Sequence, residues 1–285
     1  MGFTTLVSAT TLQALIEQRQ SLVILDASFD LADVTAGERS YREGHVPGAR
    51  YVHLDRDLSA PKTGRNGRHP LPPREAFAET AGRLGVTART QVVVYDRQAA
   101  MFAVRAWWML RWLGHDAVAV LDGGLAAWQQ AGGTLDTAVA SPAGLAPYPP
   151  RAPLVNSVDA ASLLPRIGLA RLIDARAPER FRGEVEPLDA QAGHIPGARN
   201  RFFKDNLDPD GRFKPAQQLR REFETLLAVR DPSQVVHQCG SGVTACHNLL
   251  AMEIAGLCGS ALYPGSWSEW SSDPSRPVAR ASVGA

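Results

Sequence analysis

The sequence predicts an α/β protein of two tandem domains, each a mainly parallel sheet flanked by helices. Two observations carry this prediction. Short apolar runs alternate with longer amphipathic stretches, which is typical of strands alternating with helices. The segment Gly-His-Val-Pro-Gly-Ala-Arg at 44–50 also recurs at 193–199, 149 residues further on, with Ile in place of Val. A repeat of this length indicates two homologous globular domains rather than a solenoid.

Within the first copy, the elements follow one another in the order strand, helix, strand, helix, strand. The apolar strands have no alternation of polar residues, as expected for a parallel sheet that is covered on both faces. Ligands of such sheets bind beyond the carboxyl ends of the strands. The expected strands are 22–25, 92–95 and 117–121, and the expected helices are 73–84 and 101–113.

Two further matches extend the repeat and fix the domain boundaries. Residues 91–96 correspond to 234–239, and residues 121–128 correspond to 262–270. The segment 137–153 is rich in Pro, Ala and Gly and has few regular signals, so it reads as an extended linker. We therefore expect one domain at 1–136 and a second at 154–285.

The composition excludes several classes of function. The 285 residues carry 30 Lys and Arg against 29 Asp and Glu, a net charge of +1, so no global charge points to a nucleic acid or a membrane as partner. No apolar run approaches the roughly 20 residues of a membrane helix, and three cysteines without paired spacing build no disulfide framework. We expect a cytoplasmic protein without a metal site, since the cysteines lack the short spacing of zinc ligands.

Cys239 is the candidate nucleophile. A strand-like run at 234–238 delivers it into the turn Cys-Gly-Ser-Gly-Val-Thr at 239–244, which opens into an apolar helical stretch. Backbone amides of such a turn and of a helix N-terminus form a concavity that binds anions and favours thiolate over thiol. Cys239 also stands at the carboxyl end of its strand, where the site of a parallel sheet is expected.

The first copy is predicted to be catalytically silent. It has Asp96 at the position of Cys239, and the residues that follow, 97–101, include neither a glycine nor a nucleophile. Two roles remain open for this copy: packing alone, or forming a wall of the second domain's cleft and donating side chains to it.

These features together resemble the two-domain rhodaneses over essentially the whole chain. The loop is similar to that of the 3-mercaptopyruvate sulfurtransferases, whereas members that use thiosulfate typically carry basic residues where this chain has Gly240 and Ser241. The resemblance implies that Cys239 accepts a sulfane sulfur from a small anionic donor as a persulfide, without a cofactor. It also implies an acceptor such as cyanide, a thiol or a thioredoxin-like protein. Mercaptopyruvate is the expected donor, and thiosulfate is the alternative.

Phosphatase and arsenate-reductase loops share this design, but they need an arginine six residues after the cysteine. This chain has Ala245 there. A tetrahedral dianion would lack its bidentate partner, so phosphoryl chemistry is not expected.

The resemblance also implies roles for individual residues. Proton handling falls to Ser241, to His45 of the first repeated turn and to Asp33, with Asp30 competing for the role of the aspartate. Arg182 is expected to bind the donor carboxylate. The loop residues Gly240, Gly242, Val243 and Thr244 are expected to surround the transferred sulfur.

One departure from the family pattern leaves the donor open. The mercaptopyruvate enzymes usually bring a second arginine from the segment after Arg182, but residues 183–193 contain neither Arg nor Lys. Either Arg176, Arg199 or Arg201 replaces it, or the pocket accepts another donor such as thiosulfate. A function from another class also remains, that of a non-catalytic sulfur carrier or redox-sensing module.

Overall fold

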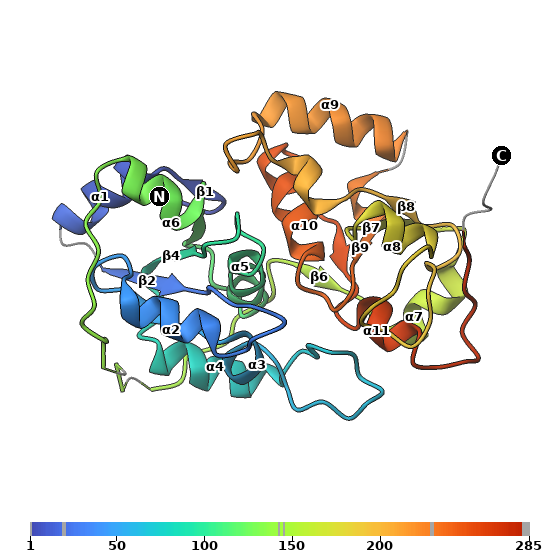
Figure 1. Cartoon of the computed structure of the whole chain (residues 1–285), viewed down its shortest axis with the longest axis horizontal. Helices are drawn as coiled ribbons and strands as arrows, with labels where there is room; N and C mark the ends of the chain where they lie inside the picture. The colour runs from blue at the N-terminus through green and yellow to red at the C-terminus, as the bar shows by residue number, and fades with distance from the viewer. Residues whose placement is uncertain (1, 19–20, 142, 145, 229–230, 281–285) are drawn as a thin grey trace. The chain divides into compact units, whose positions relative to one another are not determined.

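The computed structural model describes residues 2–18, 21–141, 143–144, 146–228 and 231–280 (Figure 1). The chain divides into two compact units. Unit 1 comprises Met1–Ala60, Pro72–Leu154 and Pro209–Phe213; unit 2 comprises Pro61–Leu71, Val155–Asp208 and Lys214–Ala285.

Unit 1 is built on a five-stranded parallel sheet in the order β1-β5-β4-β2-β3. Its strands are β1 (Leu6–Val7), β2 (Leu22–Asp26), β3 (Arg50–Tyr51), β4 (Gln91–Tyr95) and β5 (Val118–Leu121). Its helices are α1 (Ala9–Glu17), α2 (Ala36–Glu43), α3 (Leu54–Asp57), α4 (Arg74–Arg83), α5 (Ala103–Trp112) and α6 (Gly124–Gln130). Every residue of β4 is buried, as expected for a strand covered on both faces.

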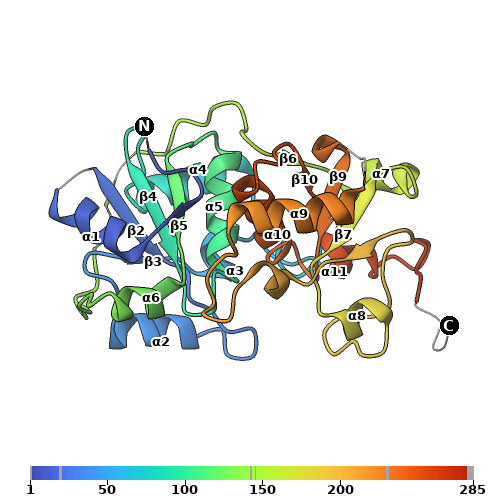
Figure 2. The same cartoon turned by 90° about the horizontal axis from the view of Figure 1, so that it is seen from above.

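Successive side chains of β4 serve two helical layers of unit 1. Val93 and Tyr95 join a core cluster that includes Leu12 of α1, Tyr41 of α2 and Trp128 of α6. Strand side chains alternate between faces, so the residues between them point to the opposite face. Figure 2 shows α4 and α5 on that other side of the unit 1 sheet.

Unit 2 repeats the same topology, with strand order β6-β10-β9-β7-β8 and all neighbours parallel. Its strands are β6 (Asn156–Ser157), β7 (Arg171–Asp174), β8 (Arg199–Asn200), β9 (Val235–Gln238) and β10 (Ala261–Leu262). Its α-helices are α7 (Ala160–Leu163), α8 (Pro178–Arg182), α9 (Ala216–Leu227), α10 (Ala245–Ile254) and α11 (Ser266–Trp270). Its short 3₁₀ helices are η1 (Leu164–Arg166), η2 (Phe203–Asn206) and η3 (Pro232–Gln234). The predicted fold class, two α/β domains with parallel sheets, is confirmed.

Two short segments each belong to the unit that is formed mainly by the other half of the chain. Pro61–Leu71 follows the first repeated turn in sequence but is part of unit 2, and Pro209–Phe213 is part of unit 1. The amide of Arg68 donates to Ser268 Oγ of unit 2 at 3.0 Å, and the amide of Phe213 donates to Asp122 Oδ1 of unit 1 at 2.9 Å. Unit 2 therefore contains side chains from the first half of the chain.

Within the described residues, no helix has the length and apolar character needed to span a membrane.

Candidate active site

Cys239 lies directly after β9 and is buried, with 1% of its surface exposed. Its amide donates to Ser266 Oγ at 3.1 Å, and its carbonyl accepts from the Trp267 amide at 3.0 Å. The carbonyl of Gly240 accepts from the Ser268 amide at 2.9 Å. These bonds fasten the cysteine loop to the start of α11 and fix its backbone.

The amides that follow Cys239 are left available. Within the described residues, the N–H groups of Gly240, Ser241, Val243 and Thr244 donate no hydrogen bond. Gly242 turns the loop with φ of +76°, and a Cβ there would lie 2.2 Å from the carbonyl oxygen of Pro264. Only glycine fits this left-handed, crowded position. Amides that are exposed in such a turn can bind an anion.

The corresponding loop of unit 1 carries its own anion. Asp96 is fully buried, and its carboxylate accepts four backbone hydrogen bonds of 2.8–2.9 Å. The donors are the amides of Gln98, Ala100, Phe102 and Ala103. Burial raises the pKa of Asp96, and the four donors act in the opposite direction. In unit 1, the side chain of Asp96 thus occupies the amides of the loop that corresponds to the Cys239 loop. The catalytic silence of this copy stays a prediction.

The side chain of Ser241 contacts a histidine, His69, that is not among the residues predicted from the sequence. Its Oγ lies 2.7 Å from Nδ1 of His69, and both residues are buried. His69 comes from Pro61–Leu71, the segment of the first half that belongs to unit 2. An imidazole beside a hydroxyl, two residues from a cysteine, can move protons.

His45, the predicted proton-handling histidine, has a structural environment in unit 1. It is completely buried, stacks on Tyr41 and places Nδ1 2.7 Å from the Tyr41 carbonyl oxygen. Its backbone pairs with Asp136 through two hydrogen bonds of 2.9 Å. His194 repeats this arrangement on Phe181, with the same stacking distance of 4.0 Å. The two copies of the repeated turn thus make the same contacts, and the histidine that lies against Ser241 is His69. A proton-handling role of His45 stays a prediction.

Asp33 and Asp30, the candidates for its acidic partner, are also engaged elsewhere. Asp33 is half-exposed and forms an ion pair of 2.7 Å with Arg39, which is the main reason why its pKa is lowered. Asp30 accepts from the amides of Ala32 and Asp33 in an exposed turn. Among the described residues, no hydrogen bond joins either aspartate to His45.

Two guanidinium groups lie against the cysteine loop, and neither is that of Arg182. A Cβ on Gly240 would lie 2.7 Å from Nη2 of Arg68 and 3.6 Å from Nη1 of Arg180. Arg182 is exposed and pairs with Glu184 at 2.7 Å. Because α8 places residues two apart on different faces, Arg180 faces the loop and Arg182 does not. Arg182 is thus not one of the two guanidinium groups near Gly240, and its role in donor binding stays a prediction.

Buried carboxylates hold these two arginines in place. Asp189 accepts from Arg68 and, at 3.2 Å, from Arg180, which also donates to Glu186 at 2.6 Å. Arg176 donates to the other oxygen of Glu186 at 3.2 Å. Burial raises the pKa of Asp189, while the charge of Arg68 lowers it. Asp189 and Glu186 thus hold the guanidinium groups of Arg68 and Arg180 beside the loop.

The three arginines considered as substitutes have other partners. Arg176 is buried and pairs with Asp174 at 2.7 Å, Arg199 donates to the Leu226 carbonyl at 2.8 Å, and Arg201 pairs with Glu222 at 2.6 Å.

Comparison with known proteins decides the family. The model of the rhodanese-like domain matches residues 8–131 and again 158–273. The chain belongs to the rhodanese family. The two matches fall on the two copies, and the second includes Cys239.

Rhodanese relatives match this chain over nearly its whole length. It is 48% identical to a probable 3-mercaptopyruvate sulfurtransferase from Pseudomonas aeruginosa, covering 98% of this chain and 99% of that protein. It is 39% identical to the human 3-mercaptopyruvate sulfurtransferase, covering 88% and 85%, and 39% identical to a putative thiosulfate sulfurtransferase from Mycobacterium tuberculosis, covering 96% of both. The 3-mercaptopyruvate sulfurtransferase from Leishmania major has the same fold, with a TM-score of 0.81 at 30% identity over 94% of this chain and 74% of that one.

The rhodanese site thus includes three residues that the sequence reasoning missed: His69, Arg68 and Arg180. The first two are 172 residues away from the loop, and no local pattern links them to it. One signal was present in the sequence, because Arg68 and His69 are adjacent in a Gly- and Pro-rich stretch without helix or strand pattern. Such a stretch can carry functional side chains.

Proposed function

We propose that this rhodanese transfers the sulfur of 3-mercaptopyruvate to a thiophilic acceptor through a persulfide on Cys239. The observation that carries this proposal is the set of unoccupied amides around Cys239, in contrast to the same loop of unit 1, which Asp96 fills. The amides stabilise a negative charge on sulfur before and after transfer. Cyanide, a small thiol or a thioredoxin-like protein would serve as acceptor, and a cytoplasmic location would suit a working thiolate.

The first step forms one bond and breaks another. The Cys239 sulfur attacks the sulfur of mercaptopyruvate, the carbon–sulfur bond breaks, and its electron pair leaves on carbon as the enolate of pyruvate. The enolate takes up one proton, which the Ser241–His69 pair is placed to deliver. The persulfide then gives its outer sulfur to the acceptor, and Cys239 returns as a thiolate.

Arg180 and Arg68 would bind the carboxylate of the donor, since a planar guanidinium group donates two parallel hydrogen bonds to a carboxylate. Both are already matched by Asp189 and Glu186. The site therefore offers little uncompensated positive charge, and Gly240 and Ser241 add none. This balance suits the single carboxylate of mercaptopyruvate better than the dianion thiosulfate.

Thiosulfate remains the second candidate donor, because two guanidinium groups face the loop and several relatives carry a thiosulfate name. The test measures kcat/KM for each donor with cyanide as acceptor, by the thiocyanate formed. We expect mercaptopyruvate to be preferred. A preference for thiosulfate would reverse the donor assignment, and absence of thiocyanate with both donors would favour a non-catalytic carrier or redox-sensing module.

A further inference from the structure

Arg50 and Arg199 end the two copies of the repeated turn, but their guanidinium groups have different surroundings. Arg199 donates to the carbonyl of Leu226 at 2.8 Å, in the last turn of α9. Arg50 lies near the end of α4, where the carbonyl of Arg83 already accepts from the Ala143 amide at 3.0 Å. Within the described residues, the Arg50 side chain makes no hydrogen bond or ion pair, and its Nε is buried.

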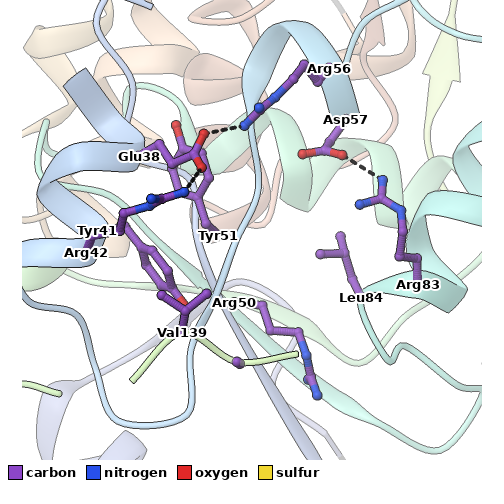
Figure 3. Close-up of a pocket in the computed structure, with 11 residues that line it drawn as sticks. Glu38, Tyr41, Arg42, Arg50, Tyr51, Arg56, Asp57, Arg83, Leu84 and Val139 are labelled. Carbon is purple, nitrogen blue, oxygen red and sulfur yellow. Dashed lines mark hydrogen bonds and ion pairs between the residues drawn. The ribbon is translucent and has the colours of Figure 1, made fainter. Parts of the chain in front are cut away.

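Arg50 lines a pocket of about 390 Å³ that lies wholly within unit 1 (Figure 3). The pocket falls within the usual size of small-molecule sites. Figure 3 shows Arg50 at its lower edge, between a group formed by Glu38 and Arg42 and a group formed by Asp57 and Arg83. Tyr41, Tyr51, Leu84 and Val139 supply apolar surface.

The other arginines of this pocket are already matched by carboxylates. Glu38 accepts from Arg42 at 2.8 Å and from Arg56 at 2.6 Å, one on each oxygen. Asp57 accepts from Arg83 at 2.7 Å. The four arginines of the lining face two carboxylates, which leaves an excess of two positive charges. Arg56 holds the pKa of Glu38 below its usual value, so Glu38 stays ionised and keeps its partners at neutral pH.

We propose that this pocket binds a small monocarboxylate with a planar apolar body. Arg50 would hold the carboxylate through two parallel hydrogen bonds, and the ring of Tyr41, with Leu84 and Val139, would cover the apolar part. The site belongs to the copy that has no nucleophile, so binding does not depend on sulfur transfer. It gives the first copy a role beyond packing.

Isothermal titration calorimetry of the full chain with benzoate tests the proposal. We expect saturable binding that Arg50→Gln weakens at least tenfold, the effect of losing about 1.4 kcal/mol or more of a charge-assisted pair. Arg50→Lys should restore part of it. Arg199→Gln is the matched control, because it alters the same position of the second copy and should leave binding unchanged. Thermal unfolding of each variant shows whether it folds.

Four results would overturn the proposal. The first is equal binding by wild type and Arg50→Gln. The second is loss of binding in Arg180→Gln with retention in Arg50→Gln, since benzoate would then occupy the arginines at the cysteine loop. The third is inorganic phosphate or benzyl alcohol binding as tightly as benzoate, which would remove the need for a carboxylate on an apolar body. Failure of the wild type to bind benzoate at millimolar concentration would also reject it, and none of these results bears on persulfide formation at Cys239.

Discussion

Nδ1 of His69 lies 2.7 Å from Oγ of Ser241, although 172 residues separate them in the chain. The contact lies inside unit 2, because Pro61–Leu71 belongs to that unit. The hydroxyl stands two residues from the nucleophile, so the pair gives the cysteine loop a group that can take up and deliver protons. A residue from the first half of the sequence thus lies against the cysteine loop of unit 2.

Replacing His69 by Gln should lower kcat/KM for mercaptopyruvate by about 10²-fold, the usual contribution of a general acid–base group. His45→Gln is the matched control. It should leave turnover nearly unchanged and lower the free energy of unfolding by about 1–3 kcal/mol, because it removes the buried bond to the Tyr41 carbonyl. Steady-state kinetics and urea unfolding measure both. A greater loss of turnover in the His45 variant would restore the original assignment.

Arg180→Gln should raise KM for mercaptopyruvate roughly tenfold or more, since a charged hydrogen-bonding partner of the donor is removed. Arg182→Gln, two residues further on α8, should leave KM unchanged because Arg182 is exposed and pairs only with Glu184. The comparison uses one helix and one type of substitution. Equal effects in both variants would contradict the placement of Arg180 at the loop.

Gly242→Ala should abolish transfer, because the new Cβ would lie 2.2 Å from the Pro264 carbonyl oxygen and the loop would have to move. Gly168→Ala is the control, because it introduces backbone strain without a clash. Gly168 also has a left-handed φ, of +80°, but a Cβ there meets nothing within 4 Å. That control should cost about 1–2 kcal/mol of stability and leave the rate unchanged. Full activity of Gly242→Ala would show that the loop shape is not required.

His237 should make the protein less stable in acid. It is fully buried on β9, and desolvation lowers its pKa to about 3 from the usual 6.5. The unfolded chain therefore binds a proton that the folded chain excludes, so stability falls as pH drops below about 6.5 and the loss ends near pH 3. Between pH 7.5 and 5.0, wild type should lose about 2 kcal/mol more than His237→Leu. Urea unfolding at both pH values measures this difference, and identical losses would contradict the burial of a neutral imidazole.

Local patterns predicted the fold and the nucleophile, whereas long-range contacts and side-chain direction decided the rest of the site. The strand periodicity, the repeated turn and the glycine-bearing loop of Cys239 are local features, and the structure has two parallel sheets with Cys239 after β9. His69 reaches Ser241 only through the segment that changes units. Arg180 rather than Arg182 lies near the loop because of the face that the five-residue helix α8 turns toward it, and the sequence alone does not show this face.

The proton-handling role of His45 stays a prediction, and the structure shows which groups this residue contacts. Its motif occurs twice, and both copies make the same contacts. His45 stacks on Tyr41 and His194 stacks on Phe181, and Nδ1 of each histidine lies within hydrogen-bond distance of a backbone carbonyl oxygen. A feature that the silent and the catalytic copy share supports the fold rather than the chemistry.

The central claim is that Cys239 carries the transferred sulfur. Intact-mass and peptide mass spectrometry after incubation with mercaptopyruvate, without an acceptor, tests it most directly. We expect one added sulfur atom on the peptide that contains Cys239, lost when cyanide is added and absent in Cys239→Ser. Sulfur found on Cys246 or Cys258 instead, or thiocyanate formed by Cys239→Ser at the wild-type rate, would contradict the account.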